Sequence, residues 1–158
     1  LYHNRNRNRQ LESELRVTYA ELDKLLAQSD FVSIHTTLNS ASHQLIDRTR
    51  LQLMKKTAFL INTARGQLVK EVDLVRVLKS NQIAGAGLDV FETEPLPGSS
   101  PLLKMKNVVL LPHIGSATYQ TRVTMAEVAA RNLLDILAEK EPNPKFLVNP
   151  EVRNVRPL

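Results

Sequence analysis

Short apolar runs alternate with segments of helical periodicity along this chain. Leucine and valine recur at helical spacing after residue 21, around residues 47–54, from residue 74 to about 81, and from about 118 to 139. The apolar runs cover residues 30–35, 58–61, 84–90 and 108–111, and they are largely apolar along their length rather than alternating apolar and polar. Strands that are apolar on both faces and alternate with helices are typical of a parallel sheet. We therefore predict an α/β fold, a partial doubly wound parallel sheet with helices on both faces.

Polar residues mark where several of the helices should begin. Thr18 followed by Glu21 has the spacing of a capping box, so we predict a helix that starts at Thr18. Asp47 can cap the short helix that follows it, and Thr118 stands at the start of the long helix near the C-terminus. Residues 142–158 contain four prolines and no periodicity, so we predict a boundary between a main domain, 1–141, and a tail, 142–158.

Composition and charge exclude several classes of protein. Hydrophobic residues make up 42% and charged residues 23% of the chain, which is typical of a soluble globular domain, and there is no cysteine. We therefore predict a cytoplasmic protein without disulfides, a metal site or a membrane segment. The net charge is +5, of which Arg5, Arg7 and Arg9 supply three, and only 4% of residues are aromatic. Such local basicity without stacking rings does not favour a nucleic-acid partner.

Chemically capable side chains follow the predicted strands. Arg65 comes after the second strand, Asp89 and Glu94 follow the third, and His113 follows the fourth. In parallel sheets ligands bind beyond the carboxyl ends of the strands, so we expect these groups to converge. An arginine fork can hold a carboxylate, a histidine can exchange a proton near neutral pH, and a carboxylate can stabilise the imidazolium. Taken singly, Arg65, Glu94 and His113 each favour a structural role in a loop over a catalytic one, and only their convergence at one sheet edge favours catalysis.

Four sequence blocks carry a family resemblance. They are DFVSIHT at 30–36, TAFLINTARG at 57–66, GLDVFETEP at 87–95 and LPHIGSAT at 111–118. In this order and spacing they resemble the D-isomer-specific 2-hydroxyacid dehydrogenases. The last block, followed by Thr121 and Arg122, is most similar to the glyoxylate/hydroxypyruvate reductase branch and its 2-ketogluconate reductase relatives. In one place the chain departs from the family, because Thr37 stands where proline is common.

The resemblance implies a Rossmann-type cofactor domain and a role for each matching residue. His113 would be the general acid, paired with Glu94, while Arg65 would bind the 2-oxo acid together with His113 and Ser116. A nicotinamide cofactor would be bound by residues at the strand ends, namely Thr36, Thr37, Thr63, Asp89 and Gly115. The chain begins Leu1-Tyr2-His3, which corresponds to the second cofactor-domain strand of the family. We therefore expect a fragment that lacks the first strand, the glycine-rich loop and the lid domain.

The resemblance also implies an activity, the reduction of a small 2-oxo acid by NAD(P)H, in a protein expected to be a homodimer. No carboxylate occurs between Tyr2 and Glu12, where an NAD-preferring site carries an acidic residue. Asn4 could instead bind the ribose without repelling a phosphate, and Arg5, with Arg7 as a second candidate, could bind the 2′-phosphate of the coenzyme. We therefore predict that NADP(H) is preferred and that NAD(H) is possible. Two alternatives stay open. The basic segment can be a solvated loop, and the 158-residue chain, expected to be inactive by itself, can be an interaction or dimerisation module.

Overall fold

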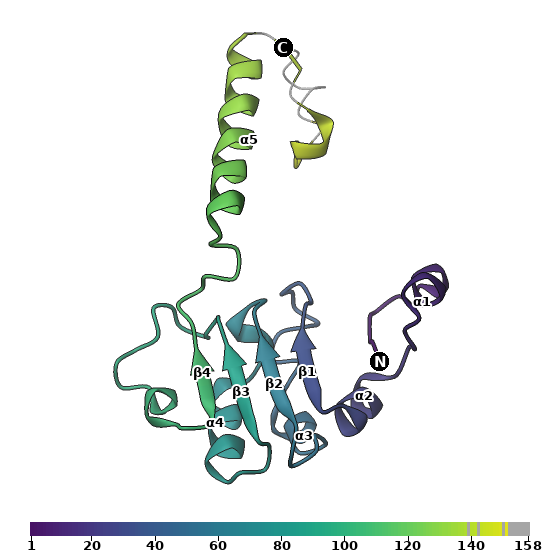
Figure 1. The fold of residues 1–158 in the computed structure, drawn as a ribbon, viewed down its shortest axis with the longest axis vertical. Coiled ribbons are helices and arrows are strands. Elements are labelled where there is room, and N and C mark those ends of the chain that lie inside the picture. The colour runs from purple at the N-terminus through teal and green to yellow at the C-terminus, as the bar shows by residue number, and fades with distance from the viewer. Residues whose placement is uncertain (139, 142, 150, 152–158) are drawn as a thin grey trace. The chain divides into compact units, whose positions relative to one another are not determined.

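A computed structural model describes residues 1–138, 140–141, 143–149 and 151 of the chain (Figure 1). The chain divides into two compact units, Leu1–His113 and Ile114–Leu158. The first unit holds the sheet and the second holds the longest helix.

A four-stranded parallel sheet forms the centre of the first unit. Its strands are β1 (Phe31–Ile34), β2 (Phe59–Asn62), β3 (Gly85–Leu88) and β4 (Val108–Leu110), in the spatial order β1-β2-β3-β4. The last paired residues of the strands lie in register across the sheet, which places every following loop at one edge; they are Ile34, Asn62, Leu88 and Leu110. The predicted parallel sheet and all four predicted strands are confirmed.

Helices pack on the face of the sheet that carries Val32, Leu60 and Ala86, which are all buried. These helices are α3 (Arg48–Leu51) and α4 (Glu71–Lys79), which lie behind the strands in Figure 1, with α2 (Leu22–Gln28) beside β1. The opposite face of the sheet remains exposed within this unit. Phe31 and Phe59 stack there with ring centroids 5.6 Å apart. This unit therefore buries its apolar residues on one side of the sheet.

The first residues of the helices test the caps that were predicted from the sequence. Asp47 Oδ1 accepts a hydrogen bond from the Arg50 N–H at 3.0 Å, so the predicted cap of α3 is confirmed. The predicted capping box at Thr18 is wrong, because α2 begins only at Leu22 and no side chain caps it. The backbone around Thr18 is instead paired with the N-terminal segment, where the Tyr2 N–H donates to the Thr18 carbonyl at 3.0 Å. The helix α1 (Arg9–Leu15) was not predicted.

The second unit contains α5 (Tyr119–Leu137) and the short 3₁₀ helix η3 (Pro144–Phe146). The Thr118 hydroxyl accepts the Thr121 N–H at 3.1 Å, so the predicted start of this helix is confirmed. Residues 142, 150 and 152–158 of the predicted tail lie outside the described residues, and the boundary at 141/142 stays a prediction. Within the described part of the chain, no helix combines the length and apolarity needed to cross a membrane.

Candidate active site

Four of the predicted site residues lie at the carboxyl edge of the sheet. Thr36 follows β1, Thr63 follows β2, and Asp89 directly follows β3, while His113 lies three residues beyond the end of β4. Thr36 and Thr63 are exposed, so their polar groups are accessible to a ligand. Asp89 is buried, and its carbonyl accepts the His113 N–H at 2.9 Å. This bond ties the chain after β4 to the end of β3.

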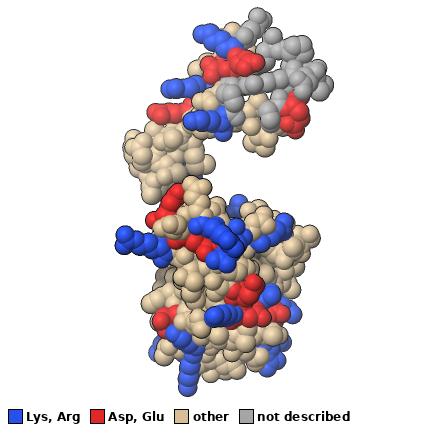
Figure 2. Space-filling model, turned by 90° about the vertical axis from the view of Figure 1, so that its right-hand side faces the viewer, with Lys and Arg blue, Asp and Glu red and all other residues tan. Residues whose placement is uncertain are grey.

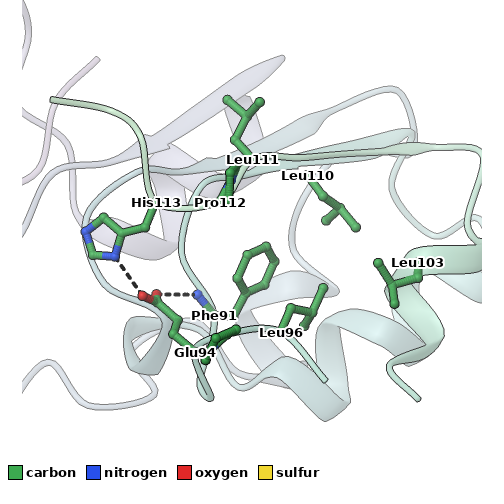
Figure 3. Close-up of a pocket in the computed structure, with 9 residues that line it drawn as sticks. Phe91, Glu94, Leu96, Leu103, Leu110, Leu111, Pro112 and His113 are labelled. Atoms are coloured by element: carbon green, nitrogen blue, oxygen red, sulfur yellow. Dashed lines mark hydrogen bonds and ion pairs between the residues drawn. The ribbon is translucent and has the colours of Figure 1, made fainter. Parts of the chain in front are cut away.

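His113 and Glu94 form a hydrogen-bonded pair. The His113 Nδ1 lies 2.7 Å from Glu94 Oε2, and Glu94 Oε1 accepts the Phe91 N–H at 3.0 Å (Figure 3). The hydrogen bond with His113, the Phe91 N–H and the charge of Arg65 hold the pKa of Glu94 below its ordinary value. An ionised carboxylate on Nδ1 leaves Nε2 as the ring nitrogen that can exchange a proton with a ligand.

The backbone of His113 has an unusual conformation. Its φ of 56° lies in the left-handed region, which residues other than glycine adopt infrequently. Such conformations persist where surrounding contacts hold them, and they are concentrated at functional sites. Here the contacts are the backbone bond to Asp89 and the side-chain bond to Glu94. The imidazole is therefore placed by a strained but doubly anchored turn.

Arg65 is presented by a tight turn after β2. Asn62, which is buried, donates from Nδ2 to the Arg65 carbonyl at 2.9 Å and accepts the Ala64 N–H at 3.1 Å. The Arg65 side chain is exposed, and its Nη1 donates to the Ala64 carbonyl at 2.6 Å. Because its charge acts on Glu94, the guanidinium belongs to the same electrostatic neighbourhood as the His113–Glu94 pair. Asn62 is a strand-end candidate to which the sequence assigned no role, and these hydrogen bonds show that it shapes the turn that presents Arg65.

A largely apolar cavity of about 610 Å³ adjoins the pair (Figure 3). His113 and Glu94 line one end of this cavity, and the other walls come from β4 and the 91–103 segment; they are Phe91, Pro95, Leu96, Leu103, Leu110, Leu111 and Pro112. Both side chains of the pair are partly exposed, so the His113 ring is accessible to a ligand in the cavity. The arrangement is suited to a proton donor that stays paired with its carboxylate.

In the N-terminal segment, charged side chains that are near neighbours in the sequence pair with each other. The Arg7 guanidinium forms a two-pronged ion pair with Glu12, with Nε and Nη2 each 2.7 Å from a carboxylate oxygen. The Tyr2 hydroxyl donates to Glu12 at 2.7 Å. The bonds from Arg7 and then Tyr2 lower the pKa of Glu12 to about 2. Arg7 is therefore already occupied by a carboxylate.

Arg5 differs from Arg7. It is exposed, its backbone N–H donates to Asn4 Oδ1 at 2.9 Å, and among the ion pairs of the described residues none involves its guanidinium. A groove of about 880 Å³ runs along this segment and is lined by Tyr2, Asn4, Asn6, Arg7, Asn8, Arg9, Leu11, Leu15 and Val17. On the face of the molecule seen in Figure 2, basic and acidic side chains are interspersed.

The remaining predicted site residues are Thr37, Gly115 and Ser116. The Thr37 carbonyl accepts the Ser42 hydroxyl at 2.7 Å, which fixes the loop after β1. Thr37 is exposed on that loop. Gly115 and Ser116 belong to the second unit, and their roles stay predictions.

Comparison with protein families gives a match over most of the chain. Residues 1–115 match the family model described as D-isomer specific 2-hydroxyacid dehydrogenase, NAD binding domain. The chain is 52% identical over its full length to a glyoxylate reductase of Thermofilum pendens and covers 46% of that protein. It is 48% identical over 96% of its length to a glyoxylate/hydroxypyruvate reductase B of Enterobacter agglomerans, of which it also covers 46%. The chain thus spans about half the length of these curated relatives.

Solved structures of similar fold include complexes with both nicotinamide coenzymes. A D-isomer specific 2-hydroxyacid dehydrogenase from Lactobacillus delbrueckii in its NAD complexed form has a TM-score of 0.77 and 33% identity, with 89% of this chain and 46% of that chain covered. A dehydrogenase of the same description from Xanthobacter autotrophicus, in complex with NADPH and MES, has a TM-score of 0.64 and 39% identity, with 75% and 48% covered.

Proposed function

This chain belongs to the family of D-isomer specific 2-hydroxyacid dehydrogenases, and on that premise we propose that the intact protein reduces a small 2-oxo acid of the glyoxylate or hydroxypyruvate type to the D-2-hydroxy acid. The observation that carries this proposal is the 2.7 Å contact between His113 and Glu94 within the electrostatic influence of Arg65. The substrate class is supported by the relatives in Thermofilum pendens and Enterobacter agglomerans, which are named for glyoxylate and hydroxypyruvate.

The residues at the sheet edge fit a nicotinamide coenzyme. Exposed threonines after β1 and β2 offer hydroxyl and backbone groups, and Arg5 offers an exposed guanidinium that suits a 2′-phosphate. We propose that Thr36, Thr63 and Asp89 bind the coenzyme along this edge and that Arg5 makes NADP(H) the preferred form. A bound reduced nicotinamide supplies the hydride that reduces the carbonyl carbon.

The chain's own residues supply charge and a proton. The Arg65 fork binds the substrate carboxylate and orients the adjacent carbonyl. His113, protonated and held on Nδ1 by Glu94, donates a proton from Nε2 to the carbonyl oxygen as that oxygen gains negative charge. One hydride on carbon and one proton on oxygen convert the 2-oxo acid into the 2-hydroxy acid. Glu94 stays ionised and stabilises the imidazolium before the transfer. In the oxidative direction the neutral His113 acts as the base.

The interaction-module alternative is not favoured by the site. A module that only binds a partner requires neither a histidine at φ 56° nor a carboxylate held on its ring at 2.7 Å. Both features serve to place one ring nitrogen, which is a requirement of proton transfer.

Steady-state kinetics of the intact protein test the proposal. Wild-type protein should consume NADPH when glyoxylate or hydroxypyruvate is added. His113→Ala should lower kcat by about 100- to 10,000-fold, the range of a general acid, while coenzyme binding measured by NADPH fluorescence stays near normal. His43→Ala is the matched control, because His43 is an exposed histidine in a polar loop. Near-normal turnover of His113→Ala would show that the proton donor has been misassigned.

The predicted homodimer and cytoplasmic location remain parts of this proposal. Sedimentation of the intact protein should give twice the mass of one chain. A monomer with full activity would contradict the dimer but not the proposed chemistry.

A further inference from the structure

The loop that carries Glu94 is fastened to the segment that follows Arg65. The closest approach is at Gly66, where an added Cβ atom would lie 1.9 Å from the Phe91 carbonyl carbon and 2.5 Å from the Glu92 nitrogen. Only glycine permits this backbone contact. Phe91 is the residue whose N–H binds Glu94, so the contact acts one step from the proposed acid–base pair.

Two carboxylates extend this contact into a reciprocal pair of hydrogen bonds. The Glu71 N–H donates to Glu92 Oε1 at 3.0 Å, and the Glu92 N–H donates to Glu71 Oε2 at 3.2 Å. Gln67 adds a third bond, from Nε2 to the Glu92 carbonyl at 3.1 Å. Glu71 and Glu92 are half-buried, and burial, followed by the charge of Glu92, raises the pKa of Glu71. Two like charges are thus kept together because each binds the other residue's backbone.

The paired residues connect the two parts of the proposed active site. Gly66, Gln67 and Glu71 continue directly from Arg65, through a 3₁₀ turn (Gly66–Leu68) into the first residue of α4. Phe91 and Glu92 lead directly into Glu94. Neither Glu71 nor Glu92 bonds to His113, Glu94 or Arg65 in the hydrogen bonds found among the described residues. Any influence on the reaction therefore passes through the backbone that they hold.

We propose that the reciprocal Glu71–Glu92 bonds, with Gln67, form a clasp that sets the distance between the substrate-binding Arg65 and the His113–Glu94 pair, so that Glu71 and Gln67 are positioning residues of the reductase. The inference rests on the proposed function for the identity of the reaction. The clasp itself depends only on the hydrogen bonds between the two loops. A misplacement of about 1 Å in a catalytic group can cost about 100-fold in rate, so a clasp remote from the reacting atoms can still control turnover.

A double-mutant cycle in the intact protein tests the clasp against a merely structural role. Glu71→Ala should lower kcat about tenfold in the wild-type background, because the Glu94 loop loses its anchor. In the Glu94→Gln background the same change should lower kcat by less than about twofold, since the carboxylate that the clasp positions is already gone. Glu71→Gln keeps an oxygen that can accept the Glu92 N–H, so it should restore most of the activity. Rates are compared well below the melting temperature of every variant.

Amide hydrogen exchange gives a readout that does not depend on activity. In Glu71→Ala the Glu92 N–H should exchange roughly tenfold faster than in the wild type, as expected for one lost hydrogen bond. Asp30→Ala is the control, because Asp30 is an exposed carboxylate that precedes β1, at the opposite end of the strands, and its side chain pairs with Lys55. It should change neither kcat nor the exchange at Glu92.

Two results would overturn the clasp. One is an equal loss of kcat from Glu71→Ala in both backgrounds, which indicates general destabilisation. The other is unchanged exchange at Glu92. If the wild-type protein reduces no 2-oxo acid, the proposed function fails, and the exchange measurement still decides whether the clasp holds the loop.

Discussion

The active-site edge and the N-terminal segment hold their charged groups by contacts of very different range. At the edge, Glu94 meets His113 across 19 positions of sequence, and the Glu71–Glu92 bonds span 21. In the N-terminal segment Arg7 meets Glu12 across only five positions. Proton transfer requires that the donor and its partner keep a fixed geometry. Contacts between segments far apart in the sequence provide such a geometry, because the whole sheet supports them. Local contacts can be changed by single substitutions with little effect on the rest of the unit, which suits the proposed role of this segment in coenzyme choice.

Among the substitutions that test this contrast between the two regions, the largest expected effect comes from Gly66, at the close approach of the two active-site segments. Gly66→Ala would place a Cβ atom 1.9 Å from the Phe91 backbone, so one of the two loops must move. We expect kcat/KM to fall by about 100-fold or more and the melting temperature to drop. Steady-state kinetics and thermal unfolding of the intact protein measure both effects.

Gly98→Ala is the matched control for this substitution. Gly98 does not have a positive φ, and apart from its two chain neighbours no atom of the described residues lies within 4 Å of a Cβ built there. The control should leave both kinetics and stability unchanged. A fully active Gly66→Ala protein would show that the approach to Phe91 is not needed for the site.

The second expected effect is a change in coenzyme preference caused by a substitution in the N-terminal segment. Arg5→Ala should reduce the preference for NADPH over NADH by roughly ten- to a hundredfold, because a charged hydrogen bond is worth about 1.5–3 kcal/mol. Arg7→Ala should change the ratio less, since Glu12 already occupies the Arg7 guanidinium. The ratio of kcat/KM values for the two coenzymes is the measurement. If the ratio changed for Arg7→Ala and not for Arg5→Ala, the assignment of the phosphate-binding arginine would be reversed.

The smallest effect is the pH dependence of the Arg7–Glu12 pair. The pKa of Glu12 is lowered to about 2 in the folded protein, from an ordinary value of 4.5. A carboxyl group with a lowered pKa stabilises the folded state above pH 4.5, and the contribution is lost as the pH falls toward 2. Glu12→Gln should therefore lower the melting temperature slightly at pH 6 and leave it nearly unchanged at pH 2, because surface ion pairs contribute little. A larger loss at pH 2 than at pH 6 would contradict this sign.

The contrast between the two regions also explains what the sequence could predict. The strands were predictable because each is a short apolar run bounded by polar residues, and their parallel order places Arg65, Glu94 and His113 at one edge. Asp47 was predictable as a cap because capping depends on a few neighbouring residues. The Thr18 cap failed because pairing with the distant Tyr2 overrode the local signal.

Other features carried no signal that sequence reasoning could use. The reciprocal bonds of Glu71 and Glu92 join two segments that are 21 positions apart in the sequence, which no local pattern brings together. The left-handed conformation of His113 is likewise imposed by contacts with Asp89 and Glu94, since histidine has no intrinsic need to adopt it.

The most direct test of the central claim is the stereochemistry of the product. Intact protein should be incubated with hydroxypyruvate and NADPH that carries deuterium at the transferable position of the nicotinamide. If His113 protonates the carbonyl oxygen while the hydride reaches the carbon, the product should be D-glycerate with one deuterium on C2, and His113→Ala should form it at less than about a hundredth of the wild-type rate. Formation of L-glycerate, a C2 without deuterium, or an unchanged rate in His113→Ala would contradict it.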